Sequence, residues 1–537
     1  MFTYSAILLV IISHVELRLL VHTEVGSIQG VPADDGDYVM FLGIPYARVN
    51  VSNPFGASIP HEKFDKLFEA FNDSAICPQM QQLYSKTNHL YGGSLDCLKL
   101  NVYVPNSKTM DKAVYLYIFG GRFVHGHSRK SSYGPKYLVR HDIIVVTINY
   151  RLGPYGFMCM DIPEIPGNQG LWDQYKAIKW VRDHIRAFGG NPQKITIGGH
   201  SSGALVVDMH LLTKQPRLFQ QVILQSGTAT NPGFVVPSNT KALISIAEKL
   251  GFITNDTYTA LSFLAKADPE TIIKATTDEY NWKPCIEKEF EGVAPFVVEN
   301  PEFSGETNID GVNILGGFTF KECIYSLYSP TYKKLISEPD VILSSINRKF
   351  NFKNDSNFIN VVKHFYLGDD TDRKSNKYKI VDFLSDFDFV YPIQRQFKKY
   401  ARHKNTNVYL YMFSYEGHLN RMKRLFNITD AGATHFDELG YIFTVYYIPD
   451  IPNSNDQRKI DQMTTLWTNF IKYGNPTPVR TELLPVSWPP LTTDTVPCLQ
   501  IDSNLTVISR PFHSNMAFWD LFYDANLDKL KIVSKKP

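Results

Sequence analysis

Short apolar runs alternate with amphipathic segments through the first half of the chain. The segments Ala113–Phe119 and Ile143–Tyr150 are apolar and rich in β-branched residues, which is typical of strands buried on both faces. Apolar residues recur at helical spacing from Gln174 to Phe188, and the Gly-Gly-Asn-Pro stretch that follows is a helix stop signal. This pattern predicts a helix between buried strands.

The alternation continues beyond residue 190. The segment KITIGGHSSG (Lys194–Gly203) predicts a strand that enters a glycine-rich turn, ALVVDMHLL (Ala204–Leu212) predicts a helix, and QQVILQSG (Gln220–Gly227) predicts the next strand. Strands that alternate with helices favour an α/β fold with a large, mostly parallel central sheet flanked by helices. Because the sequence shows no repeat, no low-complexity linker and no compositional break, we expect residues 20–537 to form a single domain with long insertions.

Composition narrows the classes of partner. Of the 537 residues, 44% are apolar and 20% are charged, which is typical of a packed globular chain. The 55 basic and 53 acidic side chains give a net charge of +2, so nothing indicates a nucleic-acid partner. Basic clusters such as Lys398–Lys404 are short and are best interpreted as solvated surface.

The N-terminus indicates export. Ala6–Ile12 is an apolar run with the length of a signal-peptide core, although a basic segment before it is absent. We expect a signal peptide over residues 1–19, and a buried first strand is the alternative. No later stretch has the length of a membrane span, and the C-terminus is not a GPI-type tail. Six N-x-S/T sequons also favour a secreted, extracellular glycoprotein: Asn50, Asn72, Asn255, Asn354, Asn427 and Asn504.

Six cysteines are too few for a disulfide scaffold in a chain of this length, although some should pair in an oxidising compartment. Cys77 and Cys97 lie close together around a polar loop and are the best candidates for a bridge. Loop closure there would contribute about 3 kcal/mol. The remaining four have no evident partners in the sequence: Cys159, Cys285, Cys323 and Cys498.

The glycine-rich turn is the first candidate for chemistry. Gly199-His200-Ser201-Ser202-Gly203 fits G-x-S-x-G, with a predicted strand before it and a predicted helix after it. Small flanking residues let such a turn close, and the helix N-terminus directs N–H groups toward developing negative charge. Ser201 is therefore a candidate nucleophile. The alternative is a strand-to-helix turn without chemistry.

Motifs spread over most of the chain indicate a family. Between about residues 21 and 523 the sequence resembles type-B carboxylesterases, a cholinesterase-like family of the α/β-hydrolase fold, and especially secreted insect carboxylesterases. The motifs that carry the resemblance are Phe41–Ala47, Ser94–Pro105, Ile148–Phe157, Pro166–Val181, Phe188–Pro192 and Trp467–Pro476.

The resemblance implies a catalytic triad. The family's nucleophile matches Ser201, its acid matches Glu322 in GFTFKEC, and its base matches His435 in GATHFDELGYIF. In that role His435 removes the serine proton during attack and returns it to the leaving alcohol, while Glu322 orients the imidazole. Cys323 stands where the family usually has glycine. Ser226 resembles a serine near the acid, and a plain strand-end serine is the alternative.

The oxyanion-hole segment departs from the family. Where the family has H-G-G-G-F, this chain reads Phe119-Gly120-Gly121-Arg122-Phe123. Backbone N–H groups of Gly121, Arg122 and Ser202 remain candidate donors. Arginine would distort a backbone that only glycine can adopt, and losing one donor costs about 10²–10³ in turnover. Two hypotheses stay open: Arg122 moves aside or binds a substrate carboxylate, or activity is weakened.

Other family positions bear on stability and substrate. Arg151 and Asp173 match a buried ion pair, whereas the arginine that pairs with the acid at Asp96 is missing, which leaves Asp96 unpaired or solvated. The loop between Cys77 and Cys97 contains Tyr84 and Tyr91 but lacks the cation-binding tryptophan of choline-ester members, which argues against acetylcholine.

The sequence thus predicts a serine hydrolase that cleaves carboxylic esters, such as xenobiotic, pheromone, hormone or dietary esters, through an acyl-enzyme. Its partner would be a small-molecule ester. No metal-ligand cluster or phosphate-binding loop is present in the sequence, and a serine esterase needs no cofactor. The alternatives are an esterase-fold binding protein or a scavenger that is acylated once, because Arg122 replaces a glycine of the oxyanion hole. Nothing in the sequence sets an oligomeric state.

Overall fold

The structure is a computed structural model. It describes residues 19–81, 90–276, 281–304, 308–330, 333, 336, 338, 340–352, 357–369, 376–448 and 451–531. The expected signal peptide falls almost entirely outside the described residues, as do the sequon at Asn354 and the side chain of Tyr84. No helix in these ranges has both the length and the hydropathy that a bilayer crossing requires.

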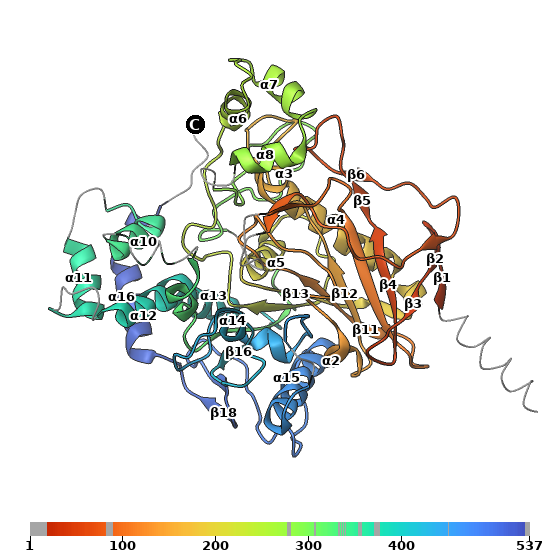
Figure 1. The fold of residues 1–537 in the computed structure, drawn as a ribbon. Coiled ribbons are helices and arrows are strands. Elements are labelled where there is room, and N and C mark those ends of the chain that lie inside the picture. Colours follow the sequence, from red (N-terminus) through yellow and green to blue (C-terminus); the bar gives the residue numbers. More distant parts are fainter. Residues whose placement is uncertain are drawn as a thin grey trace, which may run out of the picture.

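A large sheet forms the centre of the molecule (Figure 1). Within the described residues it has 11 strands, in the order β18-β17-β16-β15-β14-β13-β11-β12-β10-β4-β3. Their bounds are β3 (Val31–Pro32), β4 (Tyr38–Pro45), β10 (Lys99–Pro105), β11 (Lys112–Ile118), β12 (Ile144–Ile148), β13 (Gly190–His200), β14 (Gln221–Gln225), β15 (Asn313–Thr319), β16 (Val408–Phe413), β17 (Cys498–Ile501) and β18 (Leu505–Ile508).

The middle of this sheet is parallel and its edges are antiparallel. Every neighbouring pair from β12 through β17 runs parallel, while β10, β4 and β3 at one edge and β18 at the other run antiparallel to their neighbours. All residues of β11, β12, β14 and β16 are buried, as the continuous apolar runs predict for strands covered on both faces. The predicted mostly parallel sheet is confirmed.

Helices connect successive parallel strands. Figure 1 shows α4 and α5 above the central strands and α2 and α15 below them. The described helices are α2 (Lys136–Val139), α3 (Gly153–Phe157), α4 (Gln169–His184), α5 (Ser202–Leu212), α6 (Ala242–Lys249), α7 (Thr257–Leu264), α8 (Pro269–Thr276), α10 (Val341–Lys349), α11 (Asn357–Leu367), α12 (Lys377–Ser385), α13 (Tyr391–Tyr400), α14 (Arg421–Phe426), α15 (Ser454–Tyr473) and α16 (His513–Ala525). The long insertions are α6–α8 after β14 and α10–α13 after β15.

Small sheets lie in the N-terminal part. They pair β1 (Leu20–Thr23) with β2 (Gly26–Gln29) and β7 (Phe68–Glu69), β5 (Ala47–Arg48) with β6 (Ile59–Pro60), and β8 (Gln79–Gln81) with β9 (Leu90–Gly92). Short one-turn helices, a 3-10 turn at Ile185–Phe188 and a π-helical turn at Asp386–Val390 among them, extend or join the main helices.

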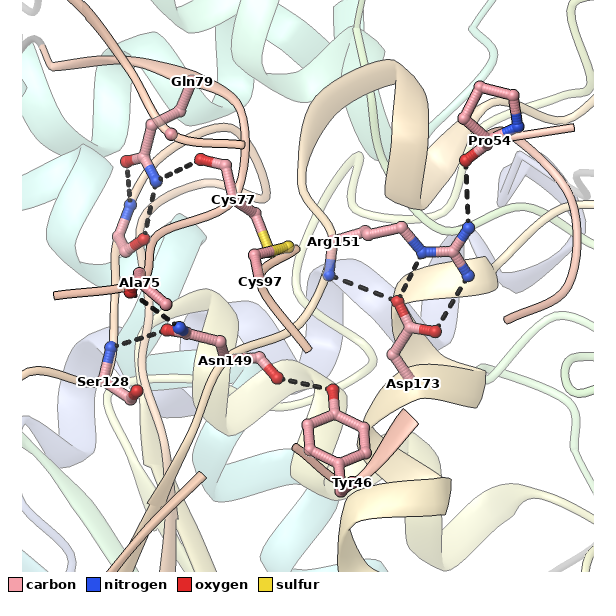
Figure 2. Close-up of a disulfide and its surroundings, with 12 residues drawn as sticks. Tyr46, Pro54, Ala75, Cys77, Gln79, Cys97, Ser128, Asn149, Arg151 and Asp173 are labelled. Atoms are coloured by element: carbon pink, nitrogen blue, oxygen red, sulfur yellow. Dashed lines mark hydrogen bonds and ion pairs between the residues drawn. A yellow bond between two sulfur atoms is a disulfide. The ribbon is translucent and has the colours of Figure 1, made fainter. Parts of the chain in front are cut away.

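Two disulfides fasten loops around the sheet. Cys77 is joined to Cys97, the pair that the sequence favours, and Cys159 is joined to Cys285, 126 positions later. Cys323 and Cys498 are unpaired and buried. Near the first bridge Gln79 donates to the carbonyl of Cys77 over 3.0 Å (Figure 2).

The buried ion pair expected from the sequence is present. Arg151 Nε and Nη2 donate to the two carboxylate oxygens of Asp173 over 2.7 and 2.8 Å, and both side chains are fully buried (Figure 2). Arg151 Nη1 also donates to the carbonyls of Pro54 and Gly56, so four hydrogen bonds hold the guanidinium in place. Asp96, by contrast, is 78% exposed and, among the described residues, forms an ion pair with Lys99, 2.7 Å away. Removing one partner of a pair buried as deeply as Arg151–Asp173 strongly destabilises a protein, because the other charge stays buried and unpaired.

Candidate active site

Ser201 occupies a strained turn between β13 and α5. Its backbone angles are φ 58° and ψ −128°, a conformation that side-chain-bearing residues rarely adopt. Its N–H donates to the carbonyl of Gln225 over 2.8 Å, which ties the turn to the neighbouring strand β14. All residues of α5 are buried, so the helix that follows is fixed by packing on every side. The turn therefore presents Ser201 at the carboxyl edge of the sheet.

The flanking glycines are required by this geometry. A Cβ atom on Gly199 would lie 2.5 Å from the backbone of Gly203, and a Cβ atom on Gly203 would lie 2.3 Å from the carbonyl oxygen of Ile118. Both approaches are far inside van der Waals contact. The G-x-S-x-G pattern thus reflects a close backbone crossing between β11, β13 and α5.

Glu322 and His435 come together at the same edge. Glu322 follows β15, and His435 lies in the segment between α14 and a short 3-10 turn at Asp437–Tyr441. Glu322 Oε2 lies 2.6 Å from His435 Nδ1, and both side chains are almost completely buried. A carboxylate at Nδ1 fixes the tautomer with a proton on that nitrogen, which leaves Nε2 as the basic nitrogen of the ring.

Further donors hold the carboxylate of Glu322. Ser226 Oγ donates to Oε1 over 2.6 Å, and the backbone N–H of Thr319 donates to the same oxygen over 2.8 Å. Thr434 Oγ1 donates to the backbone carbonyl of Glu322 over 3.1 Å. Glu322 is thereby anchored from the residue after β14, from β15 and from the segment that carries His435. Ser226 was singled out from the sequence, whereas Thr319 and Thr434 were not.

The oxyanion segment follows β11, next to the serine turn. A Cβ atom on Gly120 would lie 3.1 Å from Ser201 Cβ, so this backbone passes directly beside the candidate nucleophile. The N–H of Gly121 donates to Ser202 Oγ over 2.9 Å. Gly121 itself has φ 146°, and a Cβ there would lie 1.8 Å from the carbonyl oxygen of His125. One of the three expected donors is thus already engaged by the hydroxyl of Ser202, and nothing in the sequence indicates this contact.

Arg122 fits its backbone position better than the sequence suggests. Its φ is 56° and its side chain is exposed, so the guanidinium does not fill the core of the site. A residue other than glycine can adopt this left-handed backbone conformation at a cost of roughly 1–2 kcal/mol. Phe123, the next residue, has φ 67° and is fully buried. Glycine is mandatory at position 121 and dispensable at position 122.

Comparisons with known proteins identify the family. The model of the Carboxylesterase family matches residues 18–519, nearly the whole chain. The chain belongs to the Carboxylesterase family. It is a carboxylic ester hydrolase with the α/β-hydrolase fold.

Individual relatives cover the chain almost completely. It is 30% identical to a juvenile hormone esterase of Heliothis virescens, over 88% of each chain. It is 29% identical to an acetylcholinesterase of Bungarus fasciatus, over 94% of this chain and 86% of that protein. Among solved structures, it is similar to the juvenile hormone esterase from Manduca sexta with OTFP covalently attached, with a TM-score of 0.81 and 26% identity over 94% of this chain and 99% of the other.

The carboxylesterase carries a second buried acid–histidine contact behind the first. His200, next to Ser201, lies 3.5 Å from Glu438 through Nε2 and Oε1, and the two side chains are fully buried. Burial, followed by the negative charge of Glu322, raises the pKa of Glu438 to about 8. Burial and the positive charges of His435 and Arg421 keep the pKa of His200 well below its usual value. Both shifts favour the neutral form of the group, so this contact adds little charge behind Glu322 and His435.

His200 also packs against His435. Its ring centroid lies 4.5 Å from that of His435 and 4.0 Å from that of Phe436. His200 and Glu438 both lie in the motifs around Ser201 and His435, but the sequence does not indicate their contact. Only the fold shows that positions 200 and 438 face each other. The contact limits how far the imidazole of His435 can tilt.

The glycosylation sequons lie on the surface where they are described. Asn72, Asn255, Asn427 and Asn504 are exposed, and Asn50 is half-exposed.

Proposed function

We propose that this carboxylesterase cleaves its substrate through an acyl-enzyme on Ser201, with His435 as general base and Glu322 as the residue that orients it. The observation that carries the proposal is the 2.6 Å contact between Glu322 Oε2 and His435 Nδ1, at the edge where the strained turn presents Ser201. In this scheme Ser201 Oγ bonds to the ester carbonyl carbon while its proton moves to His435 Nε2.

The remaining steps follow from proton balance. The tetrahedral intermediate collapses, the bond to the alcohol oxygen breaks, and His435 returns the proton to that oxygen. Water then attacks the acyl group by the same route and releases a carboxylic acid. Ser202 N–H, the first of α5, and Arg122 N–H are the proposed donors to the negative oxygen, and the N-terminus of the helix adds its dipole there.

The proposed substrate is a small-molecule ester. Among the relatives, one is named for a hormone ester and another for a choline ester. The absence of tryptophan from the sequence between Cys77 and Cys97 argues against a choline ester here. Xenobiotic, pheromone, hormone and dietary esters all remain within the proposal. Secretion, with a signal peptide over residues 1–19, is part of it, supported by the two disulfides and the surface sequons.

A second candidate function rests on one contact. Because Gly121 N–H donates to Ser202 Oγ, the oxyanion pocket has one donor fewer than the segment could supply. An esterase with that defect would be acylated and then release its acyl group slowly, as a scavenger does, or would bind an ester without turning it over.

The test compares the parent with Ser201→Ala on short and medium acyl nitrophenyl esters, together with labelling by a fluorophosphonate probe. We expect turnover and labelling in the parent, and a loss of both in the variant by about 10⁴-fold or more. Thermal unfolding of the two proteins should agree, which serves as the control for folding. Labelling without turnover in the parent would favour the scavenger, and neither signal would favour a binding protein.

A further inference from the structure

Aromatic rings surround the imidazole of His435. The ring centroids of Phe389 and Phe436 each lie 4.9 Å from that of the imidazole, and the ring of Tyr325 is stacked 5.7 Å away. The ring of His200 lies 4.5 Å away on the same measure. An ester that reacts at this imidazole therefore meets whichever of these rings is open to solvent.

Exposure separates the rings that a substrate can touch from those that it cannot. His200 is fully buried and Tyr325 is 6% exposed, whereas Phe389 and Phe436 are half-buried. Ser201 is half-buried as well, so solvent reaches the candidate nucleophile. A substrate that approaches from solvent can contact the open surfaces of Phe389 and Phe436, and it does not reach the two buried rings.

A π-helical turn places Phe389 at this position. The turn Asp386–Val390 joins α12 to α13, and all of its residues are described. Four of its side chains are buried, and that of Phe389 is half-buried. A π-helical turn accommodates an extra residue, so the side chains on its two sides leave the α-helical register, and such turns are frequent at functional sites. The irregular turn thus leaves one aromatic ring open beside the imidazole.

The turn is held on both sides of Phe389. The carboxylate of Asp388 accepts hydrogen bonds from Arg348 Nη2 over 2.8 and 3.0 Å. The carboxylate of Asp386 accepts a hydrogen bond from the hydroxyl of Tyr366 over 2.7 Å. These bonds attach the turn to α10 and to α11. A backbone fixed in this way keeps the ring of Phe389 in place when a substrate binds, so a bulky group cannot easily displace it.

The role of Phe389 can be separated from support of His435. Phe436 directly follows His435, has a left-handed backbone with φ 74° and lies 4.0 Å from the ring of His200. A substitution there would disturb the imidazole itself. Phe389 belongs to the insertion after β15, so a substitution at this position leaves the segment that carries His435 unchanged.

We infer that Phe389 determines specificity by limiting the width of the group that lies beside the scissile bond. The preferred substrates are esters whose group at this position is apolar and unbranched, because a fixed aromatic ring offers an apolar contact and excludes branches. The inference rests on the proposed function, since it assumes that His435 acts on an ester bound at Ser201. It narrows the substrate class that the proposed function leaves open.

The kinetic test uses matched pairs of esters. On the acyl side, 4-nitrophenyl butanoate is compared with 4-nitrophenyl 2,2-dimethylbutanoate. On the alcohol side, phenyl acetate is compared with 2,6-dimethylphenyl acetate. For each pair, the ratio of kcat/KM between the branched and the unbranched ester is measured in the parent and in a variant. The intrinsic reactivity of the two esters cancels when these ratios are compared between proteins.

Phe389→Ala should raise the branched-to-unbranched ratio about tenfold or more in at least one pair, because even one methylene group in a pocket changes kcat/KM by about tenfold. The pair that responds identifies the side of the ester that lies against the ring. Phe389→Leu should give a smaller rise. Phe365→Ala is the matched control, because this exposed ring lies on α11, which Figure 1 shows far from β13 and α5.

A purely structural role gives a different result. If Phe389 only supported His435, Phe389→Ala would lower kcat for all four esters by the same factor and leave both ratios unchanged. Thermal unfolding of Phe389→Ala and Phe389→Leu shows whether each variant is folded. Unchanged ratios in both pairs, measured on a folded variant, would overturn the inference.

A binding measurement separates this inference from the proposed function. Calorimetric titration of Ser201→Ala with ethyl butanoate, with ethyl 2,2-dimethylbutanoate and with the two phenyl acetates needs no turnover. Adding Phe389→Ala should strengthen binding of a branched ester about tenfold relative to its unbranched partner. That result supports the role of Phe389 even if the parent hydrolyses no ester. The same relative affinities with and without Phe389→Ala reject it even if esters are cleaved at Ser201.

Discussion

Ser202 places a hydroxyl 2.9 Å from the N–H of Gly121, on the segment that runs past Ser201. In the proposed mechanism, this hydrogen bond occupies an N–H that could otherwise donate to the negatively charged carbonyl oxygen of the substrate. Glycine at position 121 cannot be exchanged, because a Cβ atom there meets the carbonyl oxygen of His125 at 1.8 Å. The side chain of residue 202 is therefore the part of this contact that can change without rebuilding the turn.

Ser202→Ala should raise turnover. Removing Oγ releases the N–H of Gly121, and one donor is worth about 10²–10³ when it is fully engaged, so a gain of about tenfold in kcat is expected. Steady-state hydrolysis of nitrophenyl esters measures it. Ser202→Thr keeps the hydroxyl and serves as the control that should show no gain. Unchanged or lower kcat in a well-folded Ser202→Ala protein would mean that the N–H of Gly121 does not point at the oxyanion.

At this scale the sequence predicts residue types better than contacts. Gly199 and Gly203 were recognisable because a tight strand-to-helix turn excludes side chains. The hydrogen bond between Gly121 and Ser202 joins residues that are 81 positions apart, and no local sequence pattern predicts it. The left-handed conformation of Arg122 was equally hidden, since arginine is not a residue that marks such a position.

Between elements, a buried glutamate joins the insertion after α8 to the start of α4. Glu287 Oε2 accepts the N–H groups of Phe296 and Val297 over 2.6 and 2.7 Å and the side-chain amide of Asn168 over 2.9 Å. Asn168 directly precedes α4. Glu287 Oε1 has no hydrogen-bond partner in the described part of the chain. Burial raises the pKa of Glu287 to about 7, because a carboxylate with one unpaired oxygen is poorly solvated there.

Glu287 makes stability depend on pH. Its folded pKa of about 7 lies above that of an unfolded glutamate, so its contribution is fully present below about pH 4.5 and is lost as pH rises to about 7. The loss amounts to about 3 kcal/mol. Glu287→Gln imitates the protonated acid, so its melting temperature should exceed that of the parent at pH 8, with a gap that shrinks toward pH 5. Scanning fluorimetry at a fixed heating rate measures both.

Glu302→Gln is the control of opposite sign. Burial alone would raise the pKa of Glu302, but the positive charges of Lys349 and Arg395 outweigh burial and hold this pKa below its usual value. The stability that this carboxylate contributes is therefore present at neutral pH and lost on acidification, so Glu302→Gln should destabilise the protein most at pH 8. If both variants shifted in the same direction at pH 8, the role given to Glu287 would be wrong.

The elements themselves were largely predictable, and their ends were not. The helix expected at Gln174–Phe188 exists, but α4 begins at Gln169 and its last turn becomes 3-10. Its start was missed because Asn168 precedes it in a left-handed conformation and bonds through its side chain to Glu287 and Cys285, which are distant in sequence. Strand β13 likewise begins four residues before the expected Lys194.

For the whole molecule, the two disulfides close loops of very different length. Cys77–Cys97 spans 20 residues within the N-terminal part, whereas Cys159–Cys285 spans 126 and attaches the insertion after β14 to the loop before α4. The short bridge could be anticipated from spacing alone. The long one could not, because only the folding of the sheet brings its two cysteines together.

Removing the longer bridge should destabilise the protein more. Loop-closure entropy predicts losses of about 5 kcal/mol for Cys159→Ser with Cys285→Ser and about 3 kcal/mol for Cys77→Ser with Cys97→Ser. Urea midpoints at pH 5 compare the two double variants with the parent. A larger loss for the shorter bridge would show that local packing around Cys77, and not chain entropy, determines the effect.

Cys323 and Cys498 give this architecture a further consequence. Burial raises the pKa of both thiols well above the ordinary value, so the native protein carries almost no thiolate at these positions. Exchange with a disulfide requires a thiolate that can reach a bridged sulfur. Folding thus keeps two nucleophiles away from two reactive bonds in the same chain. Once the chain opens near neutral pH, these thiols can ionise and attack the bridges, so we expect the rate of the first opening to govern how long the original pairing survives.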